Sequence, residues 1–388
     1  MRAGWQTKKL GDVCKIIMGQ SPDGRTYNTV GTGVPLINGP VEFSGDSFGT
    51  TIKSKFTSQP TKLCKENDLI LCVRGSTTGR MNIAGFDACI GRGVAAIRAK
   101  EYQPWINHFI NWKRDEIYAL GTGSTFPNIS TTTLAGLPIP YPLVIEQQRI
   151  VAILDEVFDA ITTAKDNTEK NIQSAHALFE SQLETIFNQR GPSWVERTLS
   201  EIAITFGRGK SKHRPRNAPH LYGGKHPFIQ TGDVRNADHI ITEYSQTYSE
   251  AGLAQSKLWP KGTICITIAA NIAETAILGF DACFPDSVIG VVANPKEADV
   301  GFIEYLLQAF KASIQAMGKG SAQANINLGT FENERFPFPP ISEQQRIVSR
   351  LDNLNAEVQS LESIYQQKLA KLDELKKSLL HQAFTGQL

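Results

Sequence analysis

The stretch IEQQRIVAILD (Ile145–Asp155) is followed much later by SEQQRIVSRLD (Ser342–Asp352), so the letters EQQRIV recur 197 residues further along the chain. Other segments match in the same order: WQTKKLGDV with WVERTLSEI, GFDAC with GFDAC, and GTGSTFPNIS with GKGSAQANIN. The spacing between matched segments grows from 189 to 197 residues, as expected if loops changed length while the framework stayed the same. The chain therefore reads as two copies of one unit.

A long helix is predicted at the end of each copy. No glycine or proline lies between Pro142 and Gly191, or between Pro340 and Gly386. Apolar residues recur in both windows in alternating steps of three and four, the pattern of coiled-coil helices. Each helix alone would expose its apolar stripe. We therefore expect residues 142–190 and 339–388 to be two spacer helices that pack against each other in antiparallel orientation.

The first part of each copy, residues 1–141 and 191–338, is predicted to be an α+β domain. Short β-prone runs such as DLILCVRG and SVIGVVA are separated by Gly, Asn, Pro and Asp turns. The proline clusters PIPYP and FPFPP end each domain before its helix. The predicted fold class is α+β, with two tandem-duplicated domains separated by two long antiparallel coiled-coil helices.

Composition excludes several classes of protein. The 388 residues are 41% hydrophobic and 20% charged, with a net charge of +2, which is typical of a soluble globular protein. No apolar run approaches about 18 residues, and no charged-then-apolar leader begins the chain, so no membrane partner is expected. The six cysteines form no C-x-x-C pair, which argues against a metal site or a disulfide framework and favours a reducing, cytoplasmic setting.

Motifs that carry catalysis are missing from the sequence. It has no G-x-x-x-x-G-K-[ST] phosphate loop and no H-E-x-x-H. It also lacks the Asn-Pro-Pro-aromatic motif and the glycine-rich cofactor loop that a base-modifying adenine methyltransferase needs. We therefore expect no catalytic residues, no metal and no cofactor bound by this chain.

Binding residues are the remaining candidates. The loop GRGKSKHRPR (Gly207–Arg216) places five cations at alternate positions, which suits a mobile loop laid along phosphates, although a merely solvated loop is an equal alternative. In the first copy, RGSTTGR (Arg74–Arg80) and GRG (Gly91–Gly93) combine arginines, which can pair bidentately with guanine, with small residues. A glycine hairpin with charged ends is an equal alternative there. Cys72 and Cys265, like Cys89 and Cys283, fall at places that we read as corresponding core positions.

The order of these parts resembles the specificity subunit of Type I restriction–modification systems over the whole chain. MGQSPDGRTYN followed by VPLINGP, GTGSTFPNIS, the P-x-P…EQQRIV helix start and the terminal SLLHQAFTGQL carry the resemblance. It implies two target recognition domains that bind a bipartite, asymmetric site in double-stranded DNA. The candidate DNA-binding residues are Gln20, Ser21, Arg74, Ser76, Thr78, Arg80, Arg92, Gly123, Ser124, Asn128, Arg208, Lys210, Lys212, Arg214, Arg216, Thr267, Asn271, Lys319, Ser321 and Gln323.

The resemblance also implies the partners. Such a subunit is non-catalytic and binds two modification subunits, which carry S-adenosylmethionine and methylate adenine. Motor-nuclease restriction subunits add cleavage of unmodified DNA. The second copy shows no counterpart of MGQSP, so we expect that its DNA contacts cannot be mapped from those of the first.

Two other classes of function remain open from the sequence. One is a stand-alone enzyme that fuses restriction and methylation, against which the missing motifs count. The other is a non-catalytic scaffold that separates two protein-binding domains. Salt-dependent binding to duplex DNA distinguishes a DNA-reading protein from a scaffold.

Overall fold

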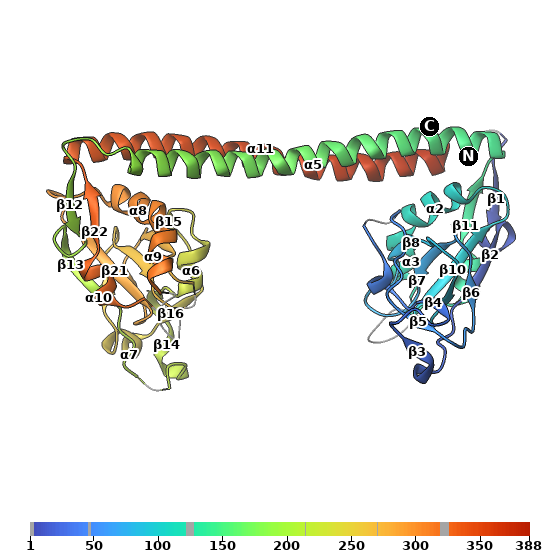
Figure 1. Ribbon diagram of the computed structural model, residues 1–388, viewed down its shortest axis with the longest axis horizontal. Coiled ribbons are helices and arrows are strands. Elements are labelled where there is room, and N and C mark those ends of the chain that lie inside the picture. Colours follow the sequence, from blue (N-terminus) through green and yellow to red (C-terminus); the bar gives the residue numbers. More distant parts are fainter. Residues whose placement is uncertain (1–3, 46–47, 122–127, 214, 270, 319–325) are drawn as a thin grey trace. The chain divides into compact units, whose positions relative to one another are not determined.

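The computed structural model describes residues 4–45, 48–121, 128–213, 215–269, 271–318 and 326–388. The chain forms two compact units, one made of residues 1–169 with 366–388 and the other of residues 170–365. Each unit holds one domain of mixed helix and strand, together with parts of the two long helices α5 (Val144–Asn188) and α11 (Ile341–Thr385) (Figure 1). The predicted fold class is confirmed.

The first domain is built on a central antiparallel sheet with the strand order β2-β10-β7-β8. Side chains of a strand point alternately to opposite faces of its sheet. On β10, Ala95 and Ile97 belong to one core cluster while Val94 and Ala96 belong to another. The sheet is therefore buried on both faces, which is why its strands read as continuous apolar runs. The strands are β2 (Cys14–Met18), β7 (Leu69–Cys72), β8 (Met81–Ile83) and β10 (Val94–Ala99).

A helix covers one face of this sheet and a second sheet covers the other. Trp105 and Phe109 of α2 (Gln103–Trp112) are fully buried in the cluster on the helix side. The second sheet has the order β3-β5-β4-β9-β6. Its strands are β3 (Tyr27–Asn28), β4 (Val34–Ile37), β5 (Phe56–Thr57), β6 (Leu63–Cys64) and β9 (Ala88–Ile90).

The second domain repeats this arrangement. Its central sheet has the order β13-β21-β18-β19-β15 and its other sheet the order β16-β14-β20-β17, while α8 (Val300–Ala309) takes the place of α2 (Figure 1). The strands are β13 (Ala203–Arg208), β14 (Tyr222–Phe228), β15 (Ile240–Ile241), β16 (Gln246–Tyr248), β17 (Leu258–Trp259), β18 (Ile264–Thr267), β19 (Thr275–Leu278), β20 (Ala282–Cys283) and β21 (Val288–Ala293).

Shorter helices complete both domains. They are α1 (Leu10–Val13), α3 (Arg114–Ala119), α4 (Thr131–Ala135), α6 (Thr231–Asn236), α7 (Glu250–Ala254), α9 (Lys311–Gly318) and α10 (Leu328–Asn333). Among the described residues, no helix combines the length and the apolar character needed to cross a membrane.

The proline clusters form short strands that close each domain. β11 (Pro138–Tyr141) pairs with β1 (Gln6–Lys9), and β22 (Arg335–Phe338) pairs with β12 (Val195–Thr198). Proline lacks a backbone N–H, and it is tolerated here because each ribbon has only two strands. The start of each domain is thus bound to its end, directly before the long helix begins.

The two long helices run in opposite directions within each unit. In the first unit, Lys165 Nζ lies 2.6 Å from Asp373 Oδ1, and the earlier residue Arg149 donates to the carbonyl of the later residue Leu388. In the second unit, His176 pairs with Glu362, and Arg350 donates to Gln182 at 3.1 Å. The apolar residues that meet there are Ile150, Leu154, Ile161, Leu380 and Phe384 in the first unit, and Leu183, Phe187 and Leu351 in the second.

The repeated EQQRIV segment has a structural role at the start of each helix. The first glutamine after the glutamate, Gln147 or Gln344, is buried. Its Nε2 donates to a proline carbonyl five residues earlier, Pro142 or Pro339, at 2.9 Å in both copies. A buried amide that lost this acceptor would carry an unsatisfied donor, so the glutamine fixes the turn from the proline strand into the helix.

Candidate DNA interface

A cavity of about 350 Å³ lies among the loops of the first domain. Its lining comes from loops that follow β2, β4, β7 and β9 and from the first residue of β3. Ser21, Arg74 and Arg92, all predicted from the sequence, meet there. Tyr27 and Asn38 also line it and were not predicted. The asparagine lies in the Asn-Gly-Pro turn of VPLINGP, and a turn signal directly after an apolar run could have drawn attention to it.

Backbone contacts hold these loops together. Gln20 N–H donates to the carbonyl of Ile90 at 2.9 Å, and Arg92 N–H donates to Ser21 Oγ at 3.2 Å. A Cβ atom on Gly93 would lie 2.6 Å from the carbonyl oxygen of Asn38, so this approach requires glycine. Ser21 therefore positions the loop of Arg92, whose own side chain is exposed.

The RGSTTGR loop presents some of its predicted residues and uses one of them internally. Arg74, Ser76 and Arg80 are exposed. Thr78 is buried, and its hydroxyl donates to the carbonyl of Gly75 at 2.8 Å, so it stabilises the turn. Asn128 forms an isolated bridge with Arg74, and Arg74 Nε approaches Asn128 Oδ1 at 3.5 Å. The predicted Gly123 and Ser124 lie outside the described residues.

The second domain does contain a counterpart of the MGQS segment. Gly209, Lys210 and Ser211 take the places of Gly19, Gln20 and Ser21, because the backbone N–H groups donate to matching strands. The expectation that the second copy has no counterpart is therefore wrong. The two segments differ in amino-acid sequence, but their backbones make the same hydrogen bonds to equivalent residues. The matched bonds are Gly19 N to Val94 O with Gly209 N to Val288 O, and Gln20 N to Ile90 O with Lys210 N to Phe284 O.

Charge is reversed between the domains at one equivalent loop position. Counted from the shared GFDAC segment, Arg92 of the first domain corresponds to Asp286 of the second. Asp286 contacts two cations of the basic loop: Arg216 Nη2 lies 2.8 Å from each carboxylate oxygen, and Arg208 Nε donates to the Asp286 carbonyl at 2.6 Å.

The basic loop is thus held in part rather than entirely mobile. Two of the cations that were predicted to follow phosphates contact Asp286. Lys210 and Lys212 are exposed. Arg214 lies outside the described residues, as do Lys319, Ser321 and Gln323.

Strand register corrects one predicted correspondence. Cys72 pairs with Val94, and its equivalent opposite Val288 is Thr267, whereas Cys265 lies two residues earlier. Cys265 therefore corresponds to Ile70, not to Cys72. Cys89 and Cys283 do correspond, because each pairs in parallel with the matching strand, β4 or β14.

Thr267 and Asn271, the other candidates of the second domain, belong to one turn. Thr267 is buried, its hydroxyl donates to the carbonyl of Asn271, and it accepts from Glu274 N–H at 3.0 Å. Asn271 Oδ1 in turn accepts from Arg235 at 3.4 Å. In this turn, Thr267 is a structural residue like Thr78.

Comparison with known proteins decides the family. Residues 2–173 and 192–370 each match the model of the Type I restriction modification DNA specificity domain. The chain belongs to this family. The paired matches agree with the two copies seen in the sequence and in the fold.

Individual relatives agree with the family assignment. The specificity subunit of the Type I restriction enzyme EcoBI of Escherichia coli is 37% identical over 429 residues, covering 99% of this chain and 86% of that protein. The MjaX specificity subunit of Methanocaldococcus jannaschii is 33% identical over 171 residues, covering 43% of this chain and 39% of its own length. A chain from the structural study of complex assembly and conformational transition of the type I R-M system superimposes with a TM-score of 0.83, over 100% of this chain and 99% of that one, at 18% identity. That last likeness concerns the fold alone.

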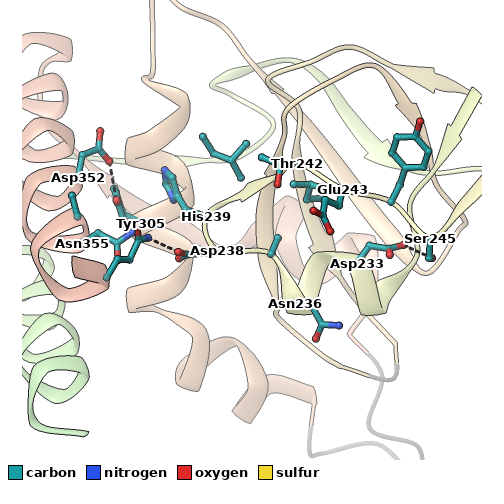
Figure 2. A pocket seen from close by; sticks show the side chains of 16 residues that line it. Asp233, Asn236, Asp238, His239, Thr242, Glu243, Ser245, Tyr305, Asp352 and Asn355 are labelled. Atoms are coloured by element: carbon teal, nitrogen blue, oxygen red, sulfur yellow. Dashed lines mark hydrogen bonds between the residues drawn. The ribbon is translucent and has the colours of Figure 1, made fainter. Parts of the chain in front are cut away.

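A second cavity in the chain is lined by acidic side chains instead of arginines. It has a volume of about 770 Å³ and lies in the second unit, lined by residues near α6 and by α11 (Figure 2). Four carboxylates line it, and they disfavour a phosphate there. They are Asp233, Asp238, Glu243 and Asp352.

The wall of this acidic cavity is where the second domain docks on α11. The Tyr305 hydroxyl donates to Asp352 Oδ1 at 2.8 Å, and the His239 ring stacks on the Tyr305 ring with centroids 4.5 Å apart (Figure 2). His239 Nδ1 also lies 2.6 Å from Glu304 Oε2. Burial alone would lower the pKa of His239, but the hydrogen bond and charge of Glu304 outweigh burial and raise it.

Proposed function

We propose that the protein is the DNA-reading subunit of a Type I restriction–modification complex and recognises a bipartite, asymmetric site. The observation that carries this proposal is the 350 Å³ cavity of the first domain, where Arg74 and Arg92 come together from separate loops. Guanidinium groups pair bidentately with guanine edges or phosphates, and Asn38 and Ser21 beside them offer further hydrogen bonds. Together these side chains could form hydrogen bonds with base edges and phosphates of a DNA duplex.

Each domain would read its own half of the site, and the halves would differ. The equivalent loop position is Arg92 in one domain and Asp286 in the other. A guanidinium can only donate hydrogen bonds and a carboxylate can only accept them. The equivalent loops of the two domains therefore present different side chains, which supports half-sites of different sequence and an asymmetric site.

The partners of the complex would supply the chemistry. In this proposal, the paired helices α5 and α11 bind two modification subunits, which hold S-adenosylmethionine and methylate adenine. Restriction subunits join the same assembly to cleave unmodified DNA. The chain itself would transfer no methyl group and cut no DNA, which the missing catalytic motifs in its sequence support.

The test is DNA binding by the complex of this chain with its modification subunits. Fluorescence anisotropy would compare a duplex carrying the methylated site of the host genome with a scrambled duplex over a range of salt concentrations. Replacing Arg74 and Arg92 by Ala should weaken preference for the site by about 1–3 kcal/mol for each lost bidentate contact. Lys15→Ala, which removes an exposed cation from the opposite end of β2, is the matched control and should change little.

Three results would contradict the proposal. The first is equal affinity of the wild-type complex for both duplexes. The second is binding without salt dependence, which would favour the protein scaffold. The third is incorporation of labelled methyl groups into DNA by the isolated chain.

A further inference from the structure

A lysine occupies the same position in both domains, directly before β6 and β17. The two segments read TKL and SKL, and their lysines are Lys62 and Lys257. The leucine after each lysine pairs in antiparallel orientation with one of the equivalent cysteines, Cys89 or Cys283. Lys62 of the first domain therefore corresponds to Lys257 of the second.

The hydroxyl residue before each lysine binds this segment to the loop that follows β2 or β13. The Thr61 hydroxyl donates to the carbonyl of Gln20, and the Ser256 hydroxyl donates to the carbonyl of Lys210 at 2.8 Å. Gln20 and Lys210 are equivalent because their backbone N–H groups make matching hydrogen bonds. The loop continues from Gln20 to Ser21, which lines the cavity of the first domain. Each lysine is therefore held beside the candidate DNA interface of its own domain.

Both lysines place positive charge at this surface. Lys62 is exposed. Burial and the positive charge of Lys210 lower the pKa of Lys257. Cations that lie this close repel each other, and an anion beside them offsets the repulsion. In the part of the chain that the structure describes, neither ammonium pairs with a carboxylate, so both can accept a phosphate as partner.

Packing on an aromatic ring does not explain why the lysine is the same in both copies. In the second domain, Nζ of Lys257 lies 3.5 Å from the centroid of the Trp259 ring. The residue of the first domain that corresponds to Trp259 is Cys64, which has no ring. The lysine is thus retained although its neighbour two residues later has changed from cysteine to tryptophan.

Other positions of the interface differ between the domains. Gln20 corresponds to Lys210, and Arg92 corresponds to Asp286. Two half-sites of different sequence have different base edges but the same sugar–phosphate backbone. Contacts to phosphates fix the position of a protein on the duplex without reading its sequence. A cation that stays the same while its neighbours change is therefore suited to the part of the DNA that both half-sites share.

We propose that Lys62 and Lys257 contact phosphates at equivalent places in the two half-sites, so that each domain is held on the duplex in the same way while it reads different bases. This inference rests on the proposed function. It adds one phosphate-binding residue to each domain, and neither lysine was among the residues predicted from the sequence.

The experiment uses the full chain in complex with its modification subunits. Fluorescence anisotropy would measure affinity for a duplex with the mapped site and for a scrambled duplex at several salt concentrations. Lys62→Ala and Lys257→Ala should each weaken binding to both duplexes several-fold and by the same factor. The plot of log affinity against log salt concentration should become flatter by about 0.9 for each lost contact, and by about twice that in the double variant. The ratio of the two affinities and the methylated site should not change.

Two kinds of control separate a phosphate contact from a general effect of charge or structure. Lys62→Arg and Lys257→Arg keep a cation that binds phosphate, so they should retain the affinity and the salt dependence. Lys15→Ala and Lys296→Ala each remove an exposed cation near the opposite end of a central sheet, on β2 and after β21 respectively. These two variants should leave the affinity and the salt dependence unchanged.

Four outcomes would overturn the inference. The first is wild-type affinity and salt dependence in both alanine variants. The second is a changed ratio of the two affinities or a changed methylated site, which would make the lysine a base-reading residue. The third is an equal flattening in Lys15→Ala and Lys296→Ala. The fourth is a loss in the arginine variants as large as in the alanine variants. A wild-type complex that shows no sequence preference would instead refute the proposed function itself.

Discussion

Asp155 Oδ1 lies 2.8 Å from His108 Nε2, and this contact joins α5 to the covering helix α2 of the first domain. The same repeat position in the second unit is Asp352, whose Oδ1 accepts from the hydroxyl of Tyr305 on α8, also at 2.8 Å. Both aspartates end the duplicated stretch around EQQRIV. The stretch is therefore conserved between the copies as the segment that enters the long helix and binds the domain to it.

Loss of either aspartate should destabilise its unit. Asp155→Ala would leave the buried His108 without this partner, and Asp352→Ala would do the same to the buried Tyr305. An unsatisfied buried group costs about 1–3 kcal/mol, so we expect the free energy of unfolding to fall by that amount in the affected unit. Urea denaturation followed by hydrogen exchange in each unit would measure it.

Asp373→Ala is the control for this prediction. Its carboxylate has the same 58% exposure as that of Asp155, but its partner is Lys165 on the helix surface. Exposed ion pairs contribute about 0–1 kcal/mol, so this change should have little effect. If the free energy of unfolding fell equally in all three variants, the contacts of Asp155 and Asp352 with their domains would contribute no more than an exposed ion pair.

The second unit should lose stability as pH rises. The pKa of His239 is raised in the folded protein by Glu304, which outweighs the opposing effect of burial. The stabilisation is thus complete below the unfolded pKa of about 6.5 and is lost as pH rises through the higher folded value. Melting curves between pH 5.5 and pH 8.5 should show this decline in the second unit.

His239→Asn should remove that pH dependence. His239 has a φ of 63°, a left-handed conformation that asparagine also tolerates, so the substitution adds little backbone strain. Asparagine does not titrate. A decline of equal size in the variant would show that another group is responsible.

The cysteines should be unreactive in the folded protein. All six are free and buried. Burial raises the pKa of Cys72 to about 11 and that of Cys14 to about 12, so the reactive thiolate is scarce at pH 8. A thiol reagent such as dithionitrobenzoate should find almost no reactive group before denaturation and all six afterwards. Rapid reaction in the native protein would contradict the assigned core positions.

Much of the fold was predictable because it depends on patterns that are local or repeated. The absence of glycine and proline and the three-and-four spacing of apolar residues predicted both helices, and α5 and α11 span Val144–Asn188 and Ile341–Thr385. The duplicated segments predicted the two copies. These patterns remain visible in the sequence because the residues that form a helix and attach it to a domain tolerate little change.

The details of the site were less predictable because they depend on strand register and on long-range pairing. MGQS and RGKS share two letters, and only the hydrogen bonds of Gly19 and Gly209 show that they are equivalent. No pattern in the sequence indicates that Asp286 lies beside Arg208 and Arg216, which come 78 and 70 residues earlier. The buried hydroxyl of Thr78 likewise could not be distinguished from an exposed one in a serine- and threonine-rich loop.

The fragment Met1–Arg190 should form a homodimer. The core of the first unit includes Leu380 and Phe384 from α11, which this fragment lacks. Leu183 and Phe187 of α5 stand at the same repeat positions, 197 residues earlier. A second copy can therefore supply equivalent side chains through an isologous contact. Light scattering should give twice the mass of the fragment, and a folded monomer would contradict the pairing.

The central claim is that each domain reads its own half of the DNA site. Its most direct test is methylation mapping by single-molecule sequencing, in cells that express the modification subunits with either the full chain or the fragment Met1–Arg190. The full chain should direct methylation to an asymmetric, bipartite site. The fragment should direct it to a palindrome made of two inverted copies of one half of that site. Methylation of the original asymmetric site by the dimeric fragment would contradict the claim.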